Sequence, residues 1–152
     1  MRLSELFDED RVELGVEVAG KDELLEHILK DLDAKGMVEN MDHALRDVVE
    51  REKVMSTGIG NGVAIPHAYT DGVDGLVAGF YRTQGGVDFA ALDGKEVDLF
   101  FIILGPKASR RNHIKVLAKI SRLLNHDEFR ENLRGAGGVG DVLDIFRRFG
   151  DR

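Results

Sequence analysis

The sequence contains no cysteine, and this absence removes several kinds of chemistry. Disulfide bonds, thiolate nucleophiles and zinc–thiolate centres are all excluded. Long hydrophobic runs are also missing, because the longest, Leu99–Leu104, falls far short of the roughly 20 residues that span a bilayer. The first residues, MRLSELFDEDRVEL, lack the apolar core of a secretory signal peptide. We therefore expect a cytoplasmic protein that is not itself in the membrane.

An excess of basic residues is missing as well. The chain of 152 residues has 28 acidic residues against 21 lysines and arginines, which gives a formal net charge of −7. Proteins that bind nucleic acid usually present a basic face, so this charge argues against such a partner and favours a basic protein partner. The length suits one domain, which would bury roughly 70% of its unfolded surface. We expect a single domain over residues 1–152.

Several standard site motifs are absent from the chain. There is no GxxxxGKS/T loop of the P-loop NTPases and no HExxH zinc motif. The run GIGNG precedes a strand rather than a helix, so it is not the dinucleotide-binding fingerprint. The run GNGVA has no serine at its centre, so it is not the nucleophile elbow of hydrolases. We expect neither a metal nor a cofactor.

Hydrophobic periodicity predicts strands and helices along the whole chain. Strands are expected at Val12–Val18, Val63–Ile65, Leu76–Arg82 and Val97–Leu104. Helices are expected at Asp22–Lys35, from about Asp42, at Ser109–Asn125, at Asp127–Arg134 and at Asp141–Phe149. The run Val97–Leu104 is apolar on both faces, which is typical of a central strand covered on both sides. We therefore predict an α/β fold, with a single mixed β-sheet of about five strands flanked by helices on both faces.

The segment Glu52–Ala68, EKVMSTGIGNGVAIPHA, is the most informative part of the sequence. A glycine-rich turn that includes Gly58 and Gly60 leads into a short apolar run, which Pro66 and His67 close. Glycine lets the backbone come close to a bound group, and proline removes a backbone donor. This arrangement predicts an imidazole nucleophile at the edge of a sheet, in a pocket that receives an anion. The alternative is a histidine that ends a strand and bonds a nearby carbonyl.

His113 is the second candidate, because it falls in the first turn of the helix that begins near Ser109. Unpaired N–H groups and the helix dipole favour an anion at that position. The apolar stripe of this helix is expected at Ile114, Leu117, Ala118, Ser121 and Leu124, which puts His113 at its edge. A half-exposed residue at a helix start is the alternative.

Arg51 lies at the end of the second predicted helix, and its fork of donors suits a phosphate. The alternative is an ordinary ion pair with Asp47 or Glu50. Ser56 and Thr57 are further candidates for donating hydroxyl groups to the same anion, although both are also common loop residues. The remaining histidines, His27, His43 and His126, are expected on the surface.

The pattern E-x6-IG-x2-VAIPHA, from Glu52 to Ala68, resembles the signature of the fructose/mannitol-type enzyme IIA (type 2) of the bacterial phosphoenolpyruvate:sugar phosphotransferase system. The likeness extends upstream to Arg51 and downstream through VDFAALDGKEVDLFFIILGP and NHIKVLAKISRLLNHDEFRENL, so it covers nearly the whole chain. It implies that His67 is the phosphorylated histidine, His113 the second active-site histidine and Arg51 the active-site arginine. It also implies a mixed sheet flanked by helices.

The reaction that the resemblance implies is a phosphoryl relay. His67 takes the group from the phosphohistidine of HPr, through Nε2, and passes it to a IIB domain that works with a membrane IIC. Phosphoryl transfer depends mainly on alignment and charge stabilisation. Arg51 and a protonated His113 would supply the charge, with Ser56, Thr57 and the loop at Gly58 and Gly60 helping. We expect a shallow, exposed His67 with an apolar rim.

Three roles follow from the resemblance. The segment LAKISRLLNHDEFRENL resembles the fructose-type proteins, which favours uptake and phosphorylation of a sugar. A nitrogen-type regulatory IIA, which acts by phosphorylation-dependent protein binding, is the alternative. A homologue that binds partners without being phosphorylated is disfavoured, because Arg51, His67 and His113 are all present. The absence of cysteine fits a IIA unit without its IIB domain, since that domain usually carries a cysteine acceptor in this family.

Overall fold

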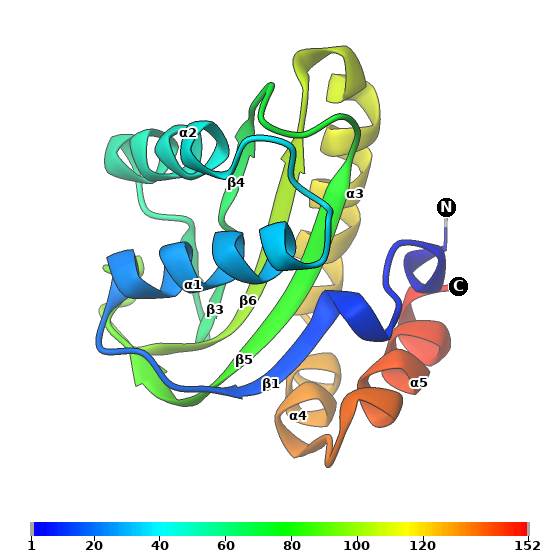
Figure 1. Cartoon of the computed structure of the whole chain (residues 1–152). Coiled ribbons are helices and arrows are strands. Elements are labelled where there is room, and N and C mark those ends of the chain that lie inside the picture. Colours follow the sequence, from blue (N-terminus) through cyan, green and yellow to red (C-terminus); the bar gives the residue numbers. More distant parts are fainter. Residues whose placement is uncertain (1, 152) are drawn as a thin grey trace.

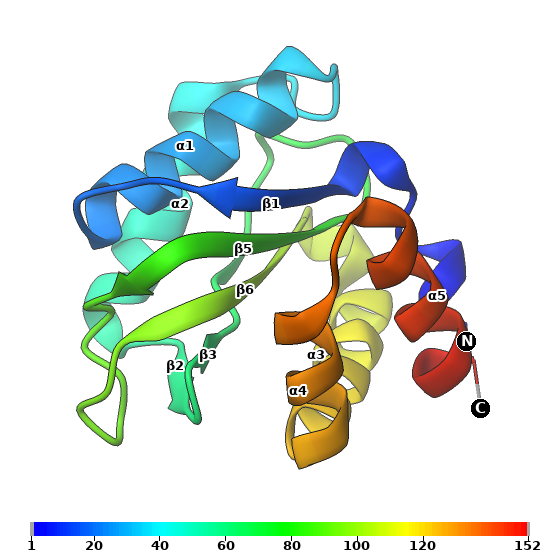
Figure 2. The same cartoon turned by 90° about the horizontal axis from the view of Figure 1, so that it is seen from below.

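The computed structural model describes residues 2–151, which form a mixed β-sheet between two layers of helices (Figures 1 and 2). The strands in this range are β1 (Val12–Val16), β2 (Gly58–Gly60), β3 (Val63–Ala64), β4 (His67–Tyr69), β5 (Val77–Val87) and β6 (Val97–Gly105). The α-helices are α1 (Lys21–Ala34), α2 (Met41–Val54), α3 (Arg110–Leu124), α4 (Asp127–Gly135) and α5 (Val139–Gly150). Three short 3₁₀ helices are η1 (Leu3–Glu5), η2 (Glu9–Arg11) and η3 (Lys107–Ser109). The predicted α/β class is confirmed.

Strand β6 is the centre of the sheet. The strand order is β1-β5-β6-β3-β2, and β4 also pairs with β6. Strands β5 and β6 are antiparallel, whereas β3 and β4 both run parallel to β6. Because β6 has neighbours on both edges and helices over both faces, every residue from Leu99 to Leu104 is fully buried. The prediction of a central strand here is confirmed.

The two faces of the sheet carry separate hydrophobic clusters. Helices α1 and α2 cover one face and α3, α4 and α5 cover the other (Figure 2). Successive side chains of β6 alternate between the clusters, with Phe100 on the α1–α2 side and Phe101 on the other. Full burial of such a side chain stabilises the fold by roughly 1.5–3 kcal/mol. Within residues 2–151, none of the helices combines the length and hydrophobicity needed to cross a bilayer.

Two strands were not predicted, and both adjoin the glycine-rich segment. Strand β2 is glycine-rich and has weak intrinsic strand propensity, but it forms a hairpin with β3 across Asn61 and Gly62. Both turn residues have positive φ, 59° and 78°, as a two-residue type I′ turn requires. The strand predicted at Val63–Ile65 was expected to end before His67. Strand β4 instead starts at His67, because pairing with β6 continues the sheet past Pro66.

Gly62→Ala is expected to destabilise the protein by about 1–3 kcal/mol. A side chain is strained at this positive φ, and the added Cβ would contact the guanidinium of Arg134 and lie 3.0 Å from Oδ1 of Asp98. Denaturant unfolding would measure the loss. Gly85→Ala is the matched control, because a Cβ at Gly85 meets nothing within 4 Å. Equal effects of the two substitutions would contradict this account of the turn.

Candidate functional site

His67, His113 and Arg51 lie around one pocket of about 370 Å³. His67 is the first residue of β4, His113 lies in the first turn of α3, and Arg51 lies in the last turn of α2. Because β4 and β6 are parallel and α3 follows β6 through η3, the two histidines meet at the carboxyl end of β6. Their ring centroids are 6.0 Å apart. Asp47, Ala68, Tyr69, Lys107 and Leu117 complete the lining.

His67 is held by a main-chain acceptor. Its Nδ1 lies 2.7 Å from the carbonyl oxygen of Ile65. A carbonyl oxygen can only accept, so Nδ1 carries the proton and Nε2 keeps its lone pair. Burial lowers the pKa of His67, and the guanidinium of Arg51 lowers it further, against a raising effect of the Ile65 bond and of Glu52. The ring is therefore neutral near pH 7, as a nucleophile must be. It is half-buried rather than fully exposed.

The burial of His113 corrects the predicted orientation of α3. Only 2% of His113 is exposed, whereas Ile114 is 52% exposed. The buried positions of the helix are His113, Val116, Ile120 and Leu124. The predicted stripe was displaced by one residue because both sets have helical spacing and each contains one polar residue. The packing of α3 against the sheet decides between them.

His113 is neutral, and its Nδ1 lacks a hydrogen-bond partner among the described residues. Burial lowers its pKa to about 4, with a smaller contribution from neighbouring His67, so it is not the cation that the sequence suggested. Its Nδ1 is buried and makes no hydrogen bond within residues 2–151. The ring of Tyr69 packs against it, with centroids 4.6 Å apart. A buried polar group without a partner is uncommon and marks a place where a ligand can contribute a bond.

Arg51 has no carboxylate partner in the described part of the chain. Asp47 lies 3.2 Å from His43 and Glu50 lies 3.4 Å from Lys53, so neither makes the ion pair considered for Arg51. Nη1 of Arg51 donates to the carbonyl of Met55 at 3.0 Å, which holds the side chain at the end of α2. The remaining guanidinium donors are available to an anion in the pocket.

The residues predicted to bind phosphate, Ser56, Thr57, Gly58 and Gly60, do not line this pocket. Thr57 donates both its N–H and its hydroxyl to Glu52. The hydroxyl of Ser56 donates to the carbonyl of Phe89, and the N–H of Gly58 donates to the Ser56 oxygen. These hydrogen bonds stabilise the loop that precedes β2.

Sequence reasoning missed Lys107 and Tyr69 as pocket residues. Tyr69 ends β4 and Lys107 follows β6, and these parallel strands end at the same edge of the sheet, which was the available signal. Lys107 is exposed and adds a second positive charge to the lining. Tyr69 lies two residues after His67 in β4, so the two side chains point to the same face.

The other three histidines, which were predicted to be surface residues, are at least partly exposed and lie outside the pocket. Nε2 of His27 is 2.8 Å from Glu13, His43 pairs with Asp47, and His126 is exposed. Across residues 2–151 there is no group of three or more His, Asp or Glu side chains arranged to hold a metal ion.

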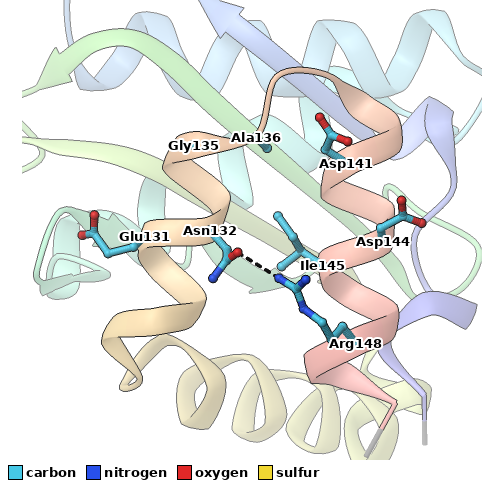
Figure 3. Close-up of a pocket in the computed structure, with 8 residues that line it drawn as sticks. All are labelled: Glu131, Asn132, Gly135, Ala136, Asp141, Asp144, Ile145 and Arg148. Atoms are coloured by element: carbon cyan, nitrogen blue, oxygen red, sulfur yellow. Dashed lines mark hydrogen bonds between the residues drawn. The ribbon is translucent and has the colours of Figure 1, made fainter.

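A second hollow, of about 480 Å³, lies between α4 and α5 (Figure 3). Arg148 donates to the side-chain oxygen of Asn132 at 2.8 Å across it, and Asp144 pairs with Arg147. Glu131 and Asp141 also line it. None of the predicted site residues lines this hollow.

Comparisons with known proteins identify the family of this chain. Residues 5–149 match the family described as "Phosphoenolpyruvate-dependent sugar phosphotransferase system, EIIA 2". The chain therefore belongs to this family, as an EIIA phosphocarrier component. It is 39% identical over 127 residues to a fructose-specific EIIA component of Haloferax volcanii, which covers 84% of this chain and 82% of that protein.

Other relatives divide between sugar-specific and regulatory proteins. The chain is 31% identical over 148 residues to the fructose-specific EIIABC component of Bacillus subtilis, covering 97% of this chain but only 23% of that protein. It is 35% identical over 143 residues to a nitrogen regulatory protein of Pseudomonas aeruginosa, covering 90% of this chain and 88% of that protein. The crystal structure of nitrogen regulatory protein IIA-Ntr from Neisseria meningitidis superposes with a TM-score of 0.83, at 31% identity, over 95% of this chain and 98% of that one.

Proposed function

We propose that the chain is a single cytoplasmic EIIA domain that relays a phosphoryl group from the phosphohistidine of HPr to a IIB domain. The observation that carries this proposal is the state of His67. Its Nδ1 proton is held by the Ile65 carbonyl, and its Nε2 lone pair is left for a pocket that Arg51 and His113 share. A neutral imidazole beside positive charge suits a phosphoryl acceptor.

In the transfer step, the Nε2 lone pair of His67 forms a bond to phosphorus. The bond between phosphorus and the donor imidazole breaks, and its electron pair returns to the donor nitrogen. The proton stays on Nδ1, which continues to donate it to the Ile65 carbonyl oxygen, so no proton has to leave His67. Arg51 and Lys107 stabilise the phosphoryl oxygens, with charge-assisted bonds of roughly 1.5–3 kcal/mol each. The dianion also favours protonation of His113, which then donates to it.

The acceptor in this proposal is a IIB domain that works with a membrane IIC. A protein of the same fold, enzyme IIA mannitol of Escherichia coli, has been solved in complex with phosphorylated enzyme IIB mannitol, with a TM-score of 0.78 and 23% identity to this chain. Exposed apolar side chains at the pocket also suit a protein partner, since Tyr69 is 39% exposed and Ile114, beside His113, is 52% exposed.

We place this relay in the uptake and phosphorylation of a fructose-type sugar, which the Haloferax relative supports. A nitrogen-type regulatory role is the second candidate, and the likeness to IIA-Ntr supports it. In that role, phosphorylation of His67 would act as a switch that adds about −1.5 to −2 charge units.

The wild-type chain is expected to gain a single phosphoryl group when incubated with phosphoenolpyruvate, enzyme I and HPr, as measured by intact mass. Addition of a IIB domain should then remove it. Reactions without HPr are the control. No mass gain would refute the relay, and a phosphorylated chain that no sugar IIB discharges would favour the regulatory role.

A further inference from the structure

Glu52 is a buried carboxylate beside the pocket, and it takes no direct part in the proposed phosphoryl transfer. It lies next to Arg51 in α2 and is only 5% exposed. The N–H of Thr57 donates to both carboxylate oxygens, at 3.1 and 3.0 Å, and its hydroxyl donates to Oε1. Nζ of Lys21, at the start of α1, lies 2.7 Å from Oε2. Burying a carboxylate is costly, and these three donors offset the cost.

A continuous path of hydrogen bonds leads from Glu52 to His67. The carbonyl oxygen of Thr57 accepts from the N–H of Ile65 at 3.1 Å. This bond extends the β2–β3 hairpin by one further pair beyond Gly58 and Ala64. The carbonyl of Ile65 then accepts from Nδ1 of His67 at 2.7 Å. Each link holds the next in place.

We propose that Glu52 is a positioning residue for His67, acting through Thr57 and Ile65, and this inference rests on the proposed phosphoryl relay. Without the carboxylate, the N–H and hydroxyl of Thr57 lose their acceptor and the end of the hairpin is free to shift. The Ile65 carbonyl shifts with it, so the imidazole loses both its orientation and the bond that keeps the proton on Nδ1. The ring then presents Nε2 less often as a lone pair.

The electrostatics of the site support the same role. The Glu52 carboxylate raises the pKa of His67, whereas burial and the guanidinium of Arg51 lower it. Glu52 therefore balances the charge of its neighbour Arg51 at the nucleophile. Removal of the carboxylate is expected to change both the geometry and the charge that His67 experiences.

The test uses Glu52→Gln, which keeps the size of the side chain but removes its charge and one acceptor oxygen. Asp31→Asn is a matched control, because Asp31 also combines a lysine partner with a hydroxyl donor. It lies 3.0 Å from Lys35 and accepts from the Tyr81 hydroxyl at 2.7 Å, outside the pocket. Two quantities are measured for each variant: the rate of phosphoryl uptake from phospho-HPr, and the tautomer of His67 from the nitrogen chemical shifts of its ring.

Glu52→Gln is expected to slow uptake roughly tenfold to a hundredfold, as displaced reacting groups do, and to populate the Nε2–H tautomer of His67. Asp31→Asn should alter neither quantity. Should Glu52→Gln fail to fold, Thr57→Val tests the next link, with the same direction of change. Unchanged uptake and tautomer in the folded variant would overturn the proposal, as would an equal change in Asp31→Asn.

The tautomer measurement also separates this inference from the proposed function. If the wild-type chain accepts no phosphoryl group, the relay is refuted and the role of Glu52 in transfer falls with it. A tautomer shift in Glu52→Gln would then still show that Glu52 positions the His67 ring. The absence of such a shift would overturn the positioning as well, whatever the wild-type chain does.

Discussion

His67→Ala is expected to take up no phosphoryl group from phospho-HPr under conditions in which the wild-type chain takes up one. Among the described residues that line the pocket, His67 alone combines a free nitrogen lone pair with partial exposure, and the substitution removes it. His113 cannot replace it, because only 2% of that residue is exposed and a donor protein cannot reach its ring. The loss should therefore be complete, and intact mass after incubation would measure it.

His27→Ala is the matched control, since His27 is a half-exposed histidine that pairs with Glu13 outside the pocket. It should be phosphorylated like the wild-type chain. Circular dichroism would establish that both variants are folded. A phosphoryl gain that survives in His67→Ala would show that another residue is the acceptor, and the assignment of Nε2 would have to be abandoned.

Acid is expected to destabilise the protein by about 3 kcal/mol through His113 between pH 6.5 and pH 4. Burial lowers the pKa of His113 from 6.5 to about 4 in the folded protein. Between these values the unfolded chain binds a proton that the folded chain does not, so folding is favoured less as the pH falls. The contribution of His113 to the free energy of unfolding keeps its full value above pH 6.5 and falls progressively towards pH 4. Each unit of difference in pKa between the folded and unfolded states is worth about 1.4 kcal/mol.

Urea unfolding of the wild-type chain and of His113→Gln at pH 7 and near pH 4 would measure this loss. The variant lacks the titrating ring, so its stability should fall less over the same interval. His67, whose pKa is also lowered by burial, changes stability in the same direction and remains in both proteins. Identical losses in the two proteins would show that His113 is not responsible.

Much of the fold could be predicted because its strongest patterns are local. The central strand was located to within one residue, since a fully apolar run of that length suits a strand covered on both faces. Helix α1 was predicted as Asp22–Lys35 and runs over Lys21–Ala34, because five buried leucine and isoleucine residues repeat on one side of it. Strands β2 and β4 were not located, because β2 is rich in glycine and β4 depends on pairing with β6, which is distant in sequence.

The site was predicted less completely, for the same reason. His67, His113 and Arg51 do share a pocket, but they come from β4, α3 and α2, and only the resemblance to a family joined them. The hydroxyl of Thr57 was predicted to face an anion. It donates instead to Glu52, a buried residue of α2 that also pairs with Lys21 of α1, and periodicity does not reveal this burial. Periodicity alone also could not choose which face of α3 is buried.

The acceptor that holds His67 belongs to the main chain, so its presence does not depend on which side chain occupies position 65. Surface residues beside the pocket that take no part in transfer, such as Ile114, can therefore diversify without altering how the ring is held. A library randomised at such surface positions would select new docking specificities while the chemistry stays constant. In this way the same arrangement of pocket residues can serve different protein partners.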